Sequence, residues 1–93
     1  MKNIYKNKEL SKLKSEKLDW NLIQNEMKRK LGSEVYESWL KKIDFIEEFN
    51  SYILISVPTR FIRDWITSRY LDQILKIVKI FKKNLKKLKS TIV

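Results

Sequence analysis

The chain has 93 residues and a net charge of +10, and it contains no cysteine and no histidine. A chain of this length fits one domain with a single core. Without those two residue types it can form no disulfide, thiol nucleophile, imidazole base or Cys/His zinc site, so we expect a non-enzyme without a metal or a cofactor.

The positive charge is concentrated at the two ends of the chain. Residues 1–19 carry a net charge of +3, residues 20–75 are neutral overall, and residues 76–93 carry seven lysines and no acid. The first 17 residues are polar and lysine-rich, which predicts a basic flexible leader before a domain of residues 18–93. Basic flanks are a moderate indication of nucleic-acid binding, although A/T-rich coding alone could also produce this lysine content.

Residues 20–31 are predicted to form the first helix. Asp19 is typical of a helix N-cap, and Gly32 is typical of the residue that ends a helix. The apolar face of this helix should consist of Trp20, Ile23, Met27 and Leu31. Leu22 falls on the opposite face, so we expect it to be an exposed apolar residue.

A second helix and a hairpin should follow. Ser33 can cap a helix of residues 34–41. Residues 43–49 and 52–57 are rich in β-formers and should pair as an antiparallel hairpin through a turn at Asn50. The second of these strands is apolar almost throughout, which predicts a central strand that is covered on both faces.

Thr59 can cap a third helix after the strand. The residues of its first turns that should face the core are Ile62, Trp65 and Ile66. Phe61 falls at the rim of this apolar arc, which favours partial exposure. From Leu71 onward the apolar residues fall on another face, which predicts a kink near residues 67–70, with Ser68 as a new cap, before the helix ends near residue 82.

The last part of the chain completes an α+β domain. Residues 82–84 are expected to form a polar connection, and residues 88–93 end in three β-branched or apolar side chains that predict a short third strand. The predicted order is two N-terminal helices, a β-hairpin, a kinked helix and a probable third strand.

The lysine-rich C-terminal part supports two binding hypotheses besides simple packing. Its amphipathic helix could lie on a membrane surface, but we favour the alternative that Ile74, Leu75, Val78 and Phe81 cover the sheet, so no membrane partner is expected. The chain also lacks a signal-type apolar segment, which favours a cytoplasmic location. The residues that could contact single-stranded nucleic acid are Lys76, Lys79, Lys83, Lys86 and Lys87. No motif for reading bases accompanies them.

Several landmarks resemble one known family in order and spacing. They are Trp20, the segment LGSEVYESWL with Tyr36 and Trp39, a hairpin, and the segments PTRFIRDWI and SRYLDQI. Together they closely resemble the N-terminal domain (domain I) of the bacterial replication initiator DnaA, over about residues 18–81. The resemblance implies helices on a three-stranded sheet, a KH-like architecture and a module that acts by protein contact.

The resemblance also implies roles for individual residues. Phe61 corresponds to a residue that contacts the replicative helicase, and Glu34, Arg60 and Asp64 are its candidate companions. In some family members an acidic residue four positions before Trp39 contacts the helicase. This chain has Val35 at that position, and its acidic residue, Glu34, stands one position earlier. Trp20 matches a residue of self-association and Leu22 is a second candidate, although core packing is an equal alternative for Trp20.

The leading hypothesis is therefore a non-catalytic interaction module of a replication initiator. Its expected partners are the replicative helicase, a second copy in a weak homo-oligomer, regulatory proteins of replication initiation and, weakly, single-stranded DNA. The module could be part of a full initiator or free-standing. The alternative is a small basic protein that binds single-stranded nucleic acid through a KH-like sheet and its lysine tail.

Overall fold

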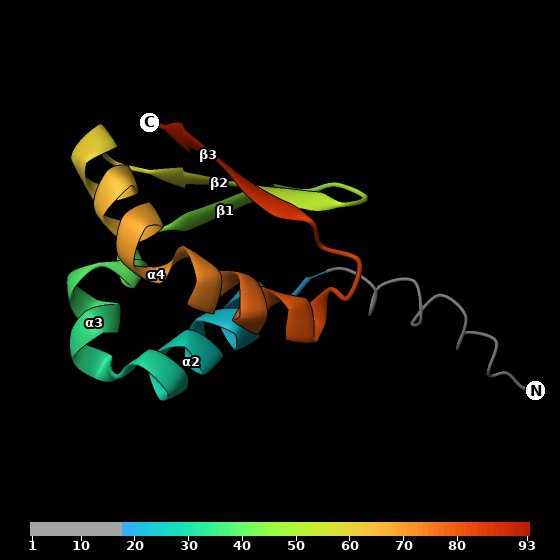
Figure 1. Cartoon of the computed structure of the whole chain (residues 1–93), viewed down its shortest axis with the longest axis horizontal. Coiled ribbons are helices and arrows are strands. Elements are labelled where there is room, and N and C mark those ends of the chain that lie inside the picture. The colour runs from blue at the N-terminus through green and yellow to red at the C-terminus, as the bar shows by residue number, and fades with distance from the viewer. Residues whose placement is uncertain (1–17) are drawn as a thin grey trace, which may run out of the picture.

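The computed structural model describes residues 18–93, so the predicted leader of residues 1–17 lies outside the described part of the chain. Figure 1 shows helices and a small sheet packed against one another. The elements in chain order are α2 (Trp20–Leu31), α3 (Ser33–Ser38), the short 3-10 helix η1 (Leu40–Lys42), β1 (Asp44–Glu48), β2 (Tyr52–Val57), α4 (Arg60–Phe81) and β3 (Lys87–Ile92). The predicted α+β class is confirmed, whereas the KH-like architecture stays a prediction.

The sheet has three strands in the order β1-β2-β3. The predicted hairpin is confirmed, because β1 and β2 pair antiparallel with a bulge between Phe45 and Glu47. The predicted third strand also exists, and it runs parallel to β2, with Ile53 opposite Leu88. A parallel neighbour requires a long crossover, and α4 provides it between β2 and β3.

The helices of residues 18–93 lie on one side of the sheet (Figure 1). The inward side chains of β2, at Ile53, Ile55 and Val57, are buried against them. β2 is central as predicted, but no helix of the described chain covers its other face, so the expectation of cover on both faces was wrong. The run of apolar residues in β2 instead combines a buried face with half-buried positions between two neighbouring strands.

The two N-terminal helices meet at Gly32. The Asp19 carboxylate accepts hydrogen bonds from the backbone N–H groups of Asn21 and Leu22, so this predicted N-cap is confirmed. Gly32 has a φ of 94°, and its carbonyl oxygen accepts from the N–H of Tyr36. This backbone conformation lets α3 begin immediately, and for that reason Ser33 is the first helical residue and not the cap that was predicted.

α4 is one continuous helix of 22 residues, capped by the Thr59 hydroxyl oxygen, which accepts from the N–H of Ile62. Figure 1 shows its axis turning between the first turns, beside the sheet, and the last turns, which run along α2. The predicted change of direction thus occurs without a break, and Ser68 does not cap a new helix. Its hydroxyl donates to the Asp64 carbonyl oxygen at 2.9 Å, a bond that often bends helices.

The segment after α4 is fastened to the hairpin. The Lys82 side chain is 8% exposed, and its Nζ lies 2.9 Å from Oε2 of Glu48 in β1. Asn84 Nδ2 donates to the Asn50 carbonyl oxygen at 2.6 Å. Residues 82–84, predicted to be only a polar connection, therefore tie the end of α4 to the first two strands.

Candidate partner-binding surface

Three aromatic rings meet where the end of α3 reaches the start of α4. The rings of Trp39 and Trp65 are stacked, with centroids 4.7 Å apart, and the Phe61 centroid lies 6.3 Å from Trp39 and 6.1 Å from Trp65. The guanidinium carbon of Arg69 lies 3.9 Å from the Trp65 centroid, so this ring is held between an indole and a cation. We call Trp39, Phe61, Trp65 and Arg69 the aromatic surface.

Local helix geometry explains this arrangement. Phe61, Trp65 and Arg69 are spaced by four residues on α4, and side chains at that spacing form a stripe along one helix face. The Thr59 cap fixes where this stripe begins. Trp39 follows the last turn of α3, where its N–H donates to the Val35 carbonyl oxygen at 2.9 Å, and its ring packs on the stripe.

Exposure separates the roles of the two α4 aromatic residues. Phe61 is 64% exposed, in agreement with its predicted place at the rim of the core. Trp65 is only half-buried and stacks on Trp39, whereas Ile66 beside it is buried in the core. The prediction that Trp65 faces the core was therefore wrong, because this ring packs on Trp39 and Arg69 and not against the buried core.

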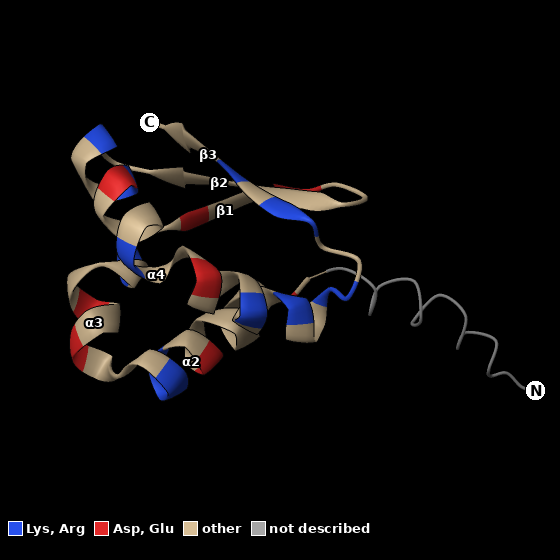
Figure 2. Ribbon diagram, in the orientation of Figure 1, with Lys and Arg blue, Asp and Glu red and all other residues tan. Residues whose placement is uncertain are grey.

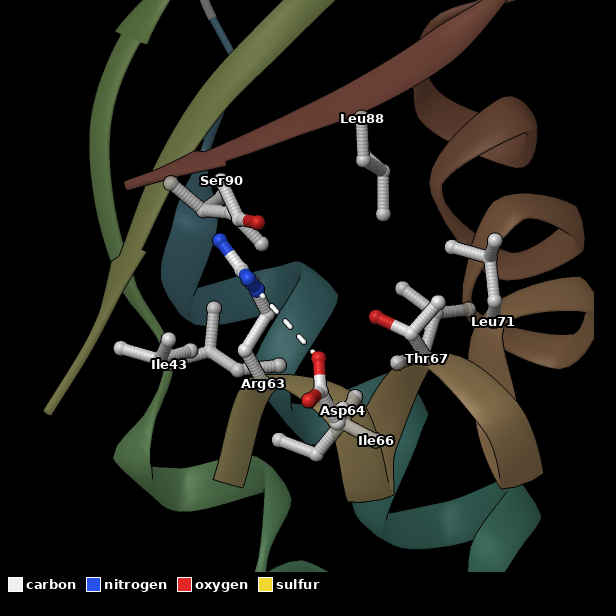
Figure 3. A pocket seen from close by; sticks show the side chains of 11 residues that line it. Ile43, Arg63, Asp64, Ile66, Thr67, Leu71, Leu88 and Ser90 are labelled. Atoms are coloured by element: carbon white, nitrogen blue, oxygen red, sulfur yellow. Dashed lines mark ion pairs between the residues drawn. The ribbon is translucent and has the colours of Figure 1, made fainter. Parts of the chain in front are cut away.

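The other residues expected to accompany Phe61 are dispersed. Arg60 is exposed at the start of α4, next to Phe61. Glu34 lies in the first turn of α3, roughly 7.5 Å along the helix axis from Trp39. Asp64 lies 3.6 Å from Nε of Arg63 and lines a cavity beside the sheet (Figure 3).

The residues predicted for self-association lie on α2. Trp20 is half-buried and stacks on Phe45 of β1, with centroids 5.6 Å apart, which supports the packing alternative for this side chain. Leu22 is 51% exposed, as its position on the helix predicted. These two residues are thus not on one continuous contact surface.

The five predicted nucleic-acid lysines, Lys76, Lys79, Lys83, Lys86 and Lys87, are all exposed. Figure 2 shows basic residues both on the last turns of α4 and on β3. Lys87 precedes Leu88, which packs toward the core, so Lys87 points to the uncovered face of the sheet. The lysines are therefore divided between the helical side and the open side of the sheet.

One charged pair outside the aromatic surface has shifted pKa values. Nη2 of Arg29 donates to Oε2 of Glu26 at 2.6 Å on the exposed side of α2. This hydrogen bond, together with the positive charges of Arg29 and Lys30, lowers the pKa of the Glu26 carboxyl group, and the same bond raises the pKa of Arg29. Within residues 18–93 there is no group of three or more acidic, histidine or cysteine side chains that could hold a metal ion.

Sequence reasoning did not include Trp39 and Arg69 in the site. The spacing of four residues from Phe61 to Arg69 could have indicated Arg69, since it is readable from the sequence. Trp39 is different, because it joins the surface only through the packing of α3 on α4. The arrangement offers exposed apolar and cationic groups, which suits binding and provides no acid–base pair for catalysis.

A comparison with protein families decides the identity of this domain. The model of the DnaA N-terminal domain matches residues 19–80, which is more than half of the chain. The chain belongs to the DnaA N-terminal domain family. This match extends from α2 to the last turn of α4 and includes the whole aromatic surface, whereas β3 lies beyond it.

Individual relatives of this DnaA N-terminal domain agree with the family match. The chain is 45% identical over 56 residues to the chromosomal replication initiator protein DnaA of Wolbachia sp. subsp. Brugia malayi, covering 60% of this chain and 12% of that protein. It is 42% identical over 57 residues to the protein of the same name from Ehrlichia ruminantium (strain Gardel), and the match covers 61% of this chain and 12% of that protein. It is 31% identical over 67 residues to the protein of the same name from Rickettsia canadensis (strain McKiel), and the match covers 72% of this chain and 14% of that protein. The matched segment thus spans only about an eighth of these curated relatives.

Proposed function

We propose that this DnaA N-terminal domain is a non-catalytic protein-interaction module of replication initiation, and that the aromatic surface is its principal contact site. The observation that carries the proposal is the exposure of Phe61, which is 64% exposed while it touches two stacked tryptophan rings. A large apolar side chain held on a rigid base loses little conformational entropy when a partner covers it.

The composition of the aromatic surface supports a protein partner. Tryptophan and arginine are enriched among the residues that contribute most to protein–protein affinity, and aromatic residues in general are enriched in such interfaces. Arg60 precedes Phe61 and Arg69 lies over Trp65, and both are exposed and could pair with carboxylates of a partner at the rim of the interface. The matched relatives are named chromosomal replication initiator proteins, which motivates a partner within replication initiation.

The partner we propose for the aromatic surface is the replicative helicase. A second copy of the domain, through the exposed Leu22 on α2, and regulatory proteins of initiation are further proposed partners.

The variant Phe61→Ala tests this proposal. We expect its affinity for the replicative helicase of the same cell, measured by surface plasmon resonance, to fall at least about tenfold, as for a central aromatic residue of an interface. Its thermal midpoint should stay within a few degrees of the parent, because most of the Phe61 side chain is in solvent.

The matched control is Phe81→Ala, which removes a phenyl ring that is 37% exposed at the far end of the same helix. This control should bind the helicase like the parent. The proposal fails if Phe61→Ala binds with unchanged affinity, or if both variants lose affinity to the same degree.

A further inference from the structure

β3 forms an edge of the sheet. β2 pairs with one side of β3 along Lys87–Ile92, and among residues 18–93 no segment pairs with its other side. Figure 1 shows β3 as the outermost strand, with the C-terminus at its end. The outward N–H and C=O groups of such a strand can accept a further strand from another chain.

A cavity of about 310 Å³ with mostly apolar walls lies next to this edge, and Arg63 and Asp64 of α4 also line it. Its walls include Leu71 of α4 and Leu88 of β3, and Ser90 of β3 contributes a small side chain that leaves the space open. Figure 3 shows Arg63 and Thr67 of α4 facing this space from the helix side. The volume is at the lower end of the range of roughly 300 to 1,000 Å³ seen for ligand pockets, so it can hold a large apolar side chain.

The two faces of β3 differ in chemistry. Leu88 and Ser90 point toward the cavity, and because side chains alternate along a strand, Lys87 and Lys89 point to the open face. Nζ of Lys89 lies 4.7 Å from the centroid of the Tyr52 ring on β2, which holds this cation over the sheet. Residues 76–93 contain no acidic residue that could neutralise these lysines from within the same segment.

We propose that the β3 edge binds an extended acidic segment of a partner protein by strand addition. The backbone of that segment pairs with β3, one of its apolar side chains enters the cavity, and the carboxylates of the alternate residues face Lys87 and Lys89. Main-chain hydrogen bonds supply affinity in this binding mode, and the pocket and the charges supply specificity.

Lys87 and Lys89 also protect the β3 edge against unwanted strand pairing, which agrees with this proposal. Lysine on an edge strand discourages pairing with neutral or basic strands, and in particular discourages aggregation. The same positive charges favour an acidic strand, so they select the partner by the charge of its alternate residues. The strand edge of this site, β3, lies beyond the segment that matches the family, whereas the α4 wall of the cavity lies within it. None of the residues of the aromatic surface lines the cavity.

The test uses the complete chain and a fluorescent nine-residue peptide of alternating glutamate and leucine. We expect binding in the micromolar range by fluorescence anisotropy, with shifts of the backbone amide resonances of residues 88–92 and of Thr67. Replacing the central leucine of the peptide by alanine should weaken binding about tenfold, because the cavity is then poorly filled. A peptide that is N-methylated at every second amide should not bind, since it cannot pair with the edge.

Two protein variants of equal charge separate this site from general electrostatic attraction. The double variant Lys87→Glu/Lys89→Glu should bind the alternating peptide at least about tenfold more weakly. Lys79→Glu/Lys83→Glu, which changes the net charge by the same amount at exposed positions off the strand, should bind within about threefold of the parent. Phe61→Ala should bind this peptide normally, so that failure here is distinguishable from failure of the proposed function.

Several results would overturn the proposal. They are equal binding of the N-methylated peptide, equal loss in the two double variants, and displacement of the peptide by a neutral strand as readily as by an acidic one. An oligothymidine that binds this edge more tightly than the peptide would assign it to nucleic acid. Self-association that disappears in Lys87→Glu/Lys89→Glu would assign the edge to a second copy, whose β1 carries acidic residues.

Discussion

At the scale of single residues, neighbours in the sequence have very different environments. Phe61 is in solvent and Trp65 is half-buried on Trp39, while Ile66 is in the core. The same contrast separates Lys82 from Lys83, because Lys82 is buried against Glu48 and Lys83 is exposed. The type of a side chain does not by itself set its exposure. Its direction relative to the sheet decides whether it is buried or exposed.

The ion pair between Lys82 and Glu48 gives a prediction at this scale. Glu48 Oε1 also accepts from the N–H of Leu18, so its carboxylate joins the end of α4 to the start of the described chain. Lys82→Ala should lower the free energy of unfolding in urea by about 2 kcal/mol, because a largely covered carboxylate loses its partner. The exposed neighbour variant Lys83→Ala should change it by less than about 0.5 kcal/mol.

Equal effects of the two lysine variants would contradict a structural role for this pair. A second check is Lys82→Met combined with Glu48→Leu, which replaces both charges by apolar groups. This double variant should recover most of the loss, since no unpaired charge is then buried.

At the scale of elements, the N-caps of the two long helices are what the sequence indicated most directly. Asp19 and Thr59 cap α2 and α4 as predicted, through local hydrogen bonds. The bend of α4 was also indicated, because its apolar residues change face along the helix. What the pattern did not indicate was that Ser68 would bond to the preceding turn and leave the helix continuous.

Gly32 supports a prediction for the junction of α2 and α3. A methyl group at this position would have nothing within 4 Å, so the cost of Gly32→Ala comes from the φ of 94° alone. We expect a loss of roughly 1 to 2 kcal/mol in the free energy of unfolding, measured by thermal or urea denaturation. Ser33→Ala, on the next, exposed residue, should have little effect. Unchanged stability of Gly32→Ala would show that the two helices can reorient without strain.

At the scale of the whole molecule, the basic charge is divided between two sides. The lysines of α4 lie on the helical side of the sheet and those of β3 on its open side. Among the residues that the structure describes, no helix combines the length and apolar character needed to cross a membrane. A single strand of nucleic acid that follows one side of the domain would therefore meet only part of this charge.

A salt titration with a single-stranded oligonucleotide tests this view. If only two or three lysines engage at once, the logarithm of the binding constant should fall with the logarithm of salt concentration with a slope of roughly −1.4 to −2.1. Binding should be weak or undetectable at physiological salt, as measured by fluorescence anisotropy. Nanomolar affinity at that salt, or a slope near −5, would instead support the alternative of a nucleic-acid-binding protein.

The sequence by itself determined the class of the domain, the order of its elements, the ends of most of them and the family, because caps, turn residues and apolar periodicity act over a few neighbouring residues. It also indicated that Phe61 would be exposed. Only the tertiary structure decided that Trp39 completes the aromatic surface, that Lys82 is buried against Glu48, and that β3 is an open edge beside a cavity. Each of these depends on segments that are distant in the chain but adjacent in space, and a local pattern does not specify how such segments pack.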